Sequence, residues 1–161
     1  MLARRLSLLL VILLIFPTSQ VVNPQRDVDA EENLAVTFAR LRAEAGLSAL
    51  QRGGGTAFAG AACRAAEHGS RDKAWVEDAN YAAVIYSSAK PESADVVAQL
   101  AGRSWPPNRR LFIGACAART PTFPSGHDWV AIGVLGDASE RSVAELLSGG
   151  AVPKQVMRHG N

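Results

Sequence analysis

Apolar residues along this chain recur at two spacings, and each spacing predicts a type of element. Spacings of three and four residues place side chains on one face of a helix. They occur in four stretches, which run from Asp29 to Gly46, Thr56 to Gly69, Pro91 to Gly102 and Asp137 to Leu147. Short runs that are almost wholly apolar predict strands, and these runs cover 81–86, 111–117 and 129–135.

Capping residues suggest where the helices begin. Asp29 and Glu32 have the spacing of a capping box, in which each side chain binds the backbone of the other end of the turn. Thr56 is expected to cap the second helix, and the segment 137–140 repeats the capping-box spacing before the last helix. The first helix is therefore predicted to start at Asp29.

The order of these elements predicts an α/β fold. Strands that are apolar on both faces are covered on both faces, and four amphipathic helices are available to cover them. We therefore expect a three-layer α/β/α sandwich around a small three-stranded sheet. The last two strands are joined by the segment from Arg119 to Asp128, without a helix between them, so the sheet is expected to be mainly antiparallel.

The first 19 residues have the layout of a secretory signal. Arg4 and Arg5 precede an apolar run over 6–16, and a polar exit begins after Pro17. The run is shorter than the roughly 20 apolar residues that a transmembrane helix needs. We expect a signal peptide at 1–19 and a secreted or periplasmic protein. The alternative is an uncleaved N-terminal anchor, which would be the only part of the protein to contact a membrane.

The rest of the chain is expected to form one domain. We predict a flexible leader over 20–28, the domain over 29–148 and a flexible tail over 149–161. Without Arg4 and Arg5 the 17 basic residues fall to 15, which equals the 15 acidic residues. A neutral domain without a cluster of Lys and Arg is not expected to bind nucleic acid, and we expect a monomer.

Cys63 and Cys116 are expected to form a disulfide, because an oxidising compartment favours pairing of two cysteines. Closing this loop would stabilise the fold by about 4 kcal/mol in the chain-entropy model. The alternative is two buried thiols that pack as small apolar residues. Neither cysteine lies in a spacing that is typical of metal sites, so no metal is expected here.

Several segments resemble one known family, the CAP domains of cysteine-rich secretory proteins, antigen 5 and plant pathogenesis-related proteins, also called SCP-like domains. The likeness is greatest to the bacterial secreted branch and covers 33–136. The segments that carry it are Asn33 with Arg40, Arg42, Gly46, Leu47 and Leu50, Asn80-Tyr81-Ala82, Pro91 to Val97, Trp105 to Arg110, Ile113 to Ala117, and Trp129-Val130. The resemblance implies the same sandwich fold.

The chain departs from this family where the family's metal ligands lie. Many CAP domains hold two His and two acidic side chains around a central cleft. Here Asn108 stands where a His is expected, and Ala79 replaces a Glu unless the neighbouring Asp78 substitutes for it. His68 is the candidate match to the other family His. The resemblance therefore implies a degenerate member with no metal and no cofactor.

The preferred hypothesis is a non-catalytic domain that binds a small apolar ligand or an envelope partner. The ligand would lie in a cleft between the second helix and the segment 105–108. The candidate binding residues are His68, Asp78, Asn80, Trp105, Asn108 and His127. One alternative is an extracellular hydrolase that uses His68 with Asp78 or His127, and another is a structural envelope protein.

His127 and Asp128 are adjacent and could suggest a catalytic pair. Adjacent residues of a strand point to opposite faces, however, so Asp128 is not expected to orient His127. No enzymatic activity is predicted from this pair.

Overall fold

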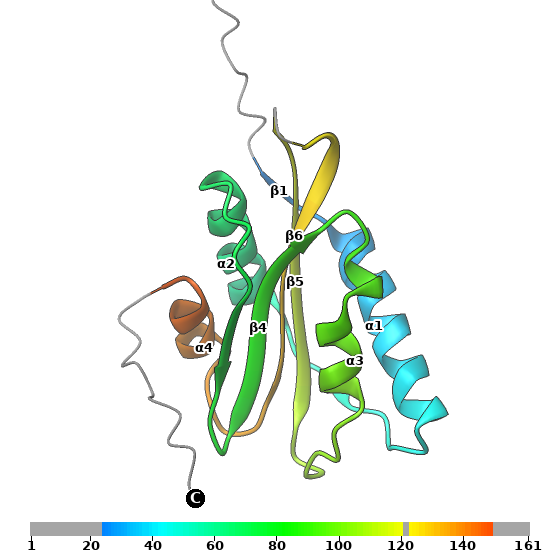
Figure 1. Ribbon diagram of the computed structural model, residues 1–161. Helices are drawn as coiled ribbons and strands as arrows, with labels where there is room; N and C mark the ends of the chain where they lie inside the picture. Colours follow the sequence, from blue (N-terminus) through cyan, green and yellow to red (C-terminus); the bar gives the residue numbers. More distant parts are fainter. Residues whose placement is uncertain (1–23, 121–122, 150–161) are drawn as a thin grey trace, which may run out of the picture.

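The computed structural model describes residues 24–120 and 123–149 (Figure 1). The predicted signal peptide, residues 20–23 of the leader and nearly all of the tail lie outside these residues. No helix within the described ranges has the length and apolar character that crossing a membrane requires. The elements in chain order are β1 (Gln25–Arg26), α1 (Val28–Glu44), β2 (Gln51–Arg52), α2 (Thr56–Glu67), β3 (Ala74–Glu77), β4 (Tyr81–Ser88), the 3-10 helix η1 (Pro91–Ser93), α3 (Asp95–Ala101), β5 (Arg110–Thr120), β6 (Phe123–Leu135) and α4 (Glu140–Leu147).

The sheet has six strands, so the predicted sandwich around a three-stranded sheet is wrong. The strand order is β1-β5-β6-β4-β3, and β2 also pairs with β5. Every pairing is antiparallel except that of β2 with β5. The three predicted strands form the centre as β4, β5 and β6, and the missed strands β1, β2 and β3 lie at the edges.

The missed strands lack the signal on which the prediction depended. β1 and β2 are both a Gln-Arg pair with exposed side chains, and a two-residue polar segment has no periodicity. β3 lies in a mostly polar part of the sequence, so it lacked the apolar run that predicts a strand. The segment from Arg119 to Asp128, expected to be a long connection, is strand apart from residues 121 and 122, which lie outside the described residues.

Helices lie on both faces of the sheet (Figure 1). α1 and α3 pack on one face, and α2 and α4 pack on the other. The α1 face buries large side chains of the central strands, including Val84, Ile113 and Ile132. On the other face, α2 contacts the sheet largely through small residues, among them Ala61, Ala62 and Ala66. Small side chains allow α2 to lie close to the sheet.

The helix caps differ from those expected from the sequence. Asp27, and not Asp29, is the N-cap of α1, where its Oδ1 accepts a hydrogen bond from the backbone N of Ala30 at 3.0 Å. Glu32 does not reach back to the cap and instead forms an ion pair with Arg52 of β2 at 2.5 Å. Gly55 precedes α2 in the left-handed conformation at φ 76°, and Ser139 caps α4. The first helix therefore begins earlier than the capping-box spacing indicated, with its N-cap at Asp27 and not at Asp29.

Candidate functional site

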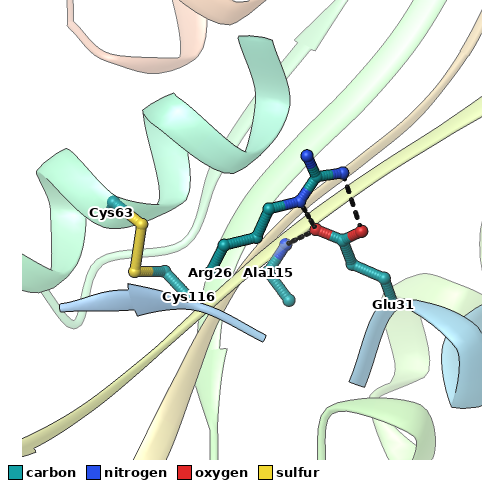
Figure 2. Close-up of a disulfide and its surroundings, with 5 residues drawn as sticks. All are labelled: Arg26, Glu31, Cys63, Ala115 and Cys116. Carbon is teal, nitrogen blue, oxygen red and sulfur yellow. Dashed lines mark hydrogen bonds and ion pairs between the residues drawn. A yellow bond between two sulfur atoms is a disulfide. The ribbon is translucent and has the colours of Figure 1, made fainter. Parts of the chain in front are cut away.

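The predicted disulfide between Cys63 and Cys116 is confirmed (Figure 2). The S–S distance is 2.17 Å, and the two Cα atoms lie 5.0 Å apart. Cys63 belongs to α2 and Cys116 to β5, so the bond joins the helix directly to the sheet. A covalent link here restricts movement of α2 relative to β5.

The cavity lies on the α2 face and has a volume of about 350 Å³. We call it the Trp129 cavity. It opens between the C-terminal half of α2, the end of α4 and the strands β3, β4 and β6. Its lining residues are Ala61, Arg64, Ala65, His68, Ser70, Asp72, Ala74, Ile85, Tyr86, Trp129, Leu147, Ser148 and Gly149.

The floor of the Trp129 cavity is apolar and held in place. Trp129 is 1% exposed, and its indole Nε1 donates to the backbone O of Ser70 at 2.6 Å. In β6 Trp129 lies opposite Cys116 of β5, so the disulfide is next to the indole. Ile85 and Leu147 complete the apolar lining from β4 and α4. A floor held by a disulfide and a hydrogen bond is largely preformed for a ligand.

The rim of the cavity is polar. Arg64 Nη2 donates to Ser148 Oγ at 3.0 Å, which connects α2 with the residue that follows α4. His68 is the C-cap of α2 and is exposed. Asp72 also lines the cavity and is exposed. The arrangement allows the apolar part of a small molecule to be buried while its polar part stays at the solvent boundary.

Two of the predicted site residues lie at or beside this cavity. His68 lines it, and His127 lies next to its floor because the His127 ring is 5.3 Å from the Trp129 ring in an edge-on arrangement. Burial lowers the pKa of His127, a hydrogen bond to the Ser87 backbone opposes this shift, and the charge of Arg71 lowers the pKa further. His68 therefore belongs to the cavity lining, and His127 is a direct neighbour of Trp129.

His127 and Asp128 do lie on opposite faces of β6. Trp129 packs on the α2 face, and alternate residues of a strand share a face, so His127 lies on that side and Asp128 on the α1 side. Asp128 contacts Asp27, the N-cap of α1. The carboxylate therefore does not orient the imidazole.

Three other predicted residues gather at the opposite end of the sheet. Asp78 and Asn80 form the turn between β3 and β4, where Asp78 Oδ1 accepts from the backbone N of Asn80 at 2.6 Å. Asn108 accepts a hydrogen bond from Arg109 at 3.3 Å, and Arg109 also donates to the backbone O of Ala79. The eight residues of β4 separate this end from the Trp129 end, a strand length of roughly 25 Å.

Trp105 lies on the α1 face, across the sheet from α2. Its Nε1 donates to the backbone O of Leu100 at 2.9 Å, and it packs against the core beneath α1 and α3. The guanidinium of Arg103 lies between Trp105 and Trp75, 5.5 Å and 5.4 Å from the two ring centres. Since α2 covers the other face, the structure does not bring Trp105 and Asn108 into one cleft with His68.

An acidic pair of Asp27 and Asp128 was not found from the sequence. Burial raises the pKa of Asp128 to about 7, with further contributions from a hydrogen bond to Asp27 and from the charges of Asp27 and Glu92. Asp128 Oδ1 is buried and has no hydrogen-bond partner among the described residues. No local pattern links two residues so far apart in the chain, and Asp27 was assigned to the leader.

Within the described ranges, no three or more His, Cys, Asp or Glu side chains gather where they could hold a metal ion. No family model matches this chain, and neither a curated protein nor a solved structure matches it. Membership of the CAP family is therefore a proposal that depends on the residues quoted for it.

Proposed function

We propose that this chain is an exported CAP-like domain that binds a small apolar ligand, without catalysis, in the Trp129 cavity. The single observation that carries the proposal is a cavity of about 350 Å³ with an apolar floor and a polar rim, beside the disulfide. Ligand sites in proteins have volumes of roughly 300–1,000 Å³ and are mostly apolar, with a few polar groups that orient the ligand. The Trp129 cavity meets each of these conditions.

The position of the cavity replaces the one expected from the sequence. The expected cleft needed α2 and the Trp105 segment to face each other, and they lie on opposite faces of the sheet. The Trp129 cavity keeps His68 and includes the apolar side chains of Trp129, Ile85 and Leu147 in its lining. Burial of apolar ligand surface on these side chains supplies the binding free energy, at about 25 cal/mol for each Å² removed from water.

Export is supported by the disulfide, whereas the CAP-like part of the proposal depends on the sequence resemblance alone. A disulfide is typical of proteins outside the cytoplasm, and Cys63 and Cys116 are bonded. Residues quoted for the family resemblance have structural roles. Arg42 is buried and joins α1 to the end of α3, and Gly114 lies where α2 crosses β5. Both residues are therefore needed by the fold itself.

The alternatives have less support in the geometry. A hydrolase that uses His68 with Asp78 needs two residues that lie at opposite ends of β4. Asp128 cannot orient either imidazole in a pair of His68 with His127, because Asp128 lies on the other face of the sheet. A purely structural protein would fill the cavity with its own side chains, whereas the described residues leave it open.

The proposal is tested with a neutral apolar fluorescent probe, N-phenyl-1-naphthylamine. The folded protein should give a saturable titration with one probe per chain. Ala65→Leu adds apolar volume to the lining and should weaken binding at least tenfold. The matched control is Ala98→Leu, on an exposed position of α3 that does not line the cavity, and it should bind like the unaltered protein.

Two outcomes would contradict the proposal. A titration of the unaltered protein that does not saturate would show that no apolar site exists. Equal binding by Ala65→Leu and Ala98→Leu, with unchanged melting temperatures, would show that the probe binds somewhere other than the Trp129 cavity.

A further inference from the structure

Asp27 connects both β1 and the start of α1 to the sheet. Its backbone N donates to the backbone O of Ala115 in β5 at 2.9 Å, next to the pairing of β1 with β5. Its Oδ1 accepts from the backbone N of Ala30 at 3.0 Å and so caps α1. The attachment of β1 and the start of α1 therefore depend on the position of Asp27.

Asp128 lies beside Asp27 because β1 and β6 flank the same part of β5. Ala117 of β5 pairs with Gln25 on one side and with Asp128 on the other. Val130, two residues further along β6, packs in the core on the α1 face, so Asp128 points to that face as well. There it meets the carboxyl group of Asp27, and its Oδ1 is buried without a partner among the described residues.

The groups around the two carboxyls do not neutralise them. Glu92 of η1 adds a third negative charge. The hydroxyl of Tyr86 in β4 donates to the backbone O of Pro91 at 2.8 Å, and burial raises the pKa of this phenol. The guanidinium of Arg26 in β1 is held by Glu31 of α1 at 2.8 and 2.9 Å (Figure 2).

We propose that Asp27 and Asp128 share one proton, and that this proton stabilises the attachment of β1 and the first turn of α1 to the sheet. The proton is bound in mildly acidic solution, and β1 and the first turn of α1 then stay docked on the sheet. When the proton dissociates, the two carboxylates and Glu92 repel one another, and the attachment of β1 and the first turn of α1 to the sheet weakens.

The direction of the pH effect follows from proton binding. Asp128 has a pKa of about 7 in the folded protein, raised from the ordinary value of 3.8. Between these two pH values the folded chain binds more protons at this site than the unfolded chain does. The stabilisation is complete below the unfolded value, and it is lost as pH rises through the folded value near neutrality.

Hydrogen exchange at pH 5 and pH 8, corrected for the intrinsic effect of pH, tests the proposal on the folded protein. We expect the amides of 25–31 to lose protection at least threefold at pH 8, while those of β4 stay unchanged. Asp128→Asn, which keeps the hydrogen bond without a charge, should keep 25–31 protected at both pH values. The matched control is Asp29→Asn in the same helical turn, which should behave like the unaltered protein.

Three results would overturn the inference. The first is equal protection of 25–31 at both pH values in the unaltered protein, and the second is the same pH dependence in Asp128→Asn. The third comes from carbon NMR of the Asp128 carboxyl group in the unaltered protein, which needs no variant. A titration midpoint below pH 5 would show that no proton is shared, whereas a midpoint between pH 6 and pH 8 supports the inference.

Discussion

Gly114 of β5 lies directly beneath Ala59 of α2, so closely that no side chain fits between them. A Cβ atom at position 114 would stand 1.9 Å from the backbone N of Ala59 and 2.3 Å from the backbone C of Phe58. Both contacts are with helix backbone, which cannot move aside as a flexible side chain can. The α2 layer can therefore approach the sheet at this point because residue 114 is a glycine.

Gly114→Ala is expected to destabilise the protein by about 3 kcal/mol, because overpacking of a close-packed contact costs about 1–3 kcal/mol and rigid backbone allows little relief. Urea unfolding measures the change. Gly60→Ala, on α2 itself, is the matched control, because its added Cβ would lie 3.4 Å from the Arg64 guanidinium. That variant should be neutral or gain up to about 1 kcal/mol, since Ala favours a helix over Gly. Equal losses in both variants would contradict the explanation.

Reduction of the bond between Cys63 and Cys116 is expected to lower the melting temperature markedly. The two cysteines are separated by 53 positions, and a loop of this length corresponds to about 4 kcal/mol in the chain-entropy model. The measurement is thermal unfolding with and without a phosphine reductant. The double variant Cys63→Ala with Cys116→Ala should melt at the lower temperature and not respond to the reductant. Two free thiols by mass spectrometry of the exported protein would contradict the prediction.

Arg42→Lys is expected to destabilise the fold by about 2–3 kcal/mol. Arg42 is 2% exposed and donates to the backbone O atoms of Ser48, Ala101 and Arg103. A lysine ammonium cannot reproduce this fork of donors, so buried carbonyls lose their partners, each at a cost of about 1–3 kcal/mol. Thermal and urea unfolding measure the loss. Arg40→Lys, on the exposed side of the same helix, should leave stability unchanged, and a similar loss there would refute this role of Arg42.

Acidification below about pH 4.5 is expected to remove part of the stability through Glu77. The pKa of Glu77 is lowered mainly by a hydrogen bond from Arg103. Burial opposes this shift, and a hydrogen bond from Trp75 lowers the pKa further. A lowered folded pKa contributes stability above the unfolded value of 4.5, which is lost as pH falls through the folded value. This sign is opposite to that of Asp128. Glu77→Gln should flatten the melting-temperature profile between pH 3 and pH 5, and an unchanged profile would count against the contact.

Periodicity predicted the central strands because their residues are apolar on both faces and so carry their own signal. The edge strands β1 and β2 are Gln-Arg pairs whose strand conformation depends on β5, far away in the chain. Their pairing is a property of the tertiary fold and leaves no local pattern. A long-range contact of this kind overrides the weak local preference of two polar residues.

The candidate site was predicted only in part, because its residues also come together through the tertiary fold. The C-terminal position of His68 on α2 follows from the helical spacing that ends at Gly69, and the structure places His68 at the Trp129 cavity. The pattern of an amphipathic helix shows which side is apolar but not which face of the sheet it covers. The sequence therefore could not show that Trp105 and His68 lie on opposite faces.

The buried carboxylate of Glu31 accepts from the backbone N of Ala115, a partner that lies 84 positions further along the chain. The first elements to be synthesised are thus among the last to find their places, and β1 has no strand to pair with until β5 exists. Contacts between such distant residues slow folding. Translation must therefore reach β5 before the N-terminal end of the domain can dock on the sheet.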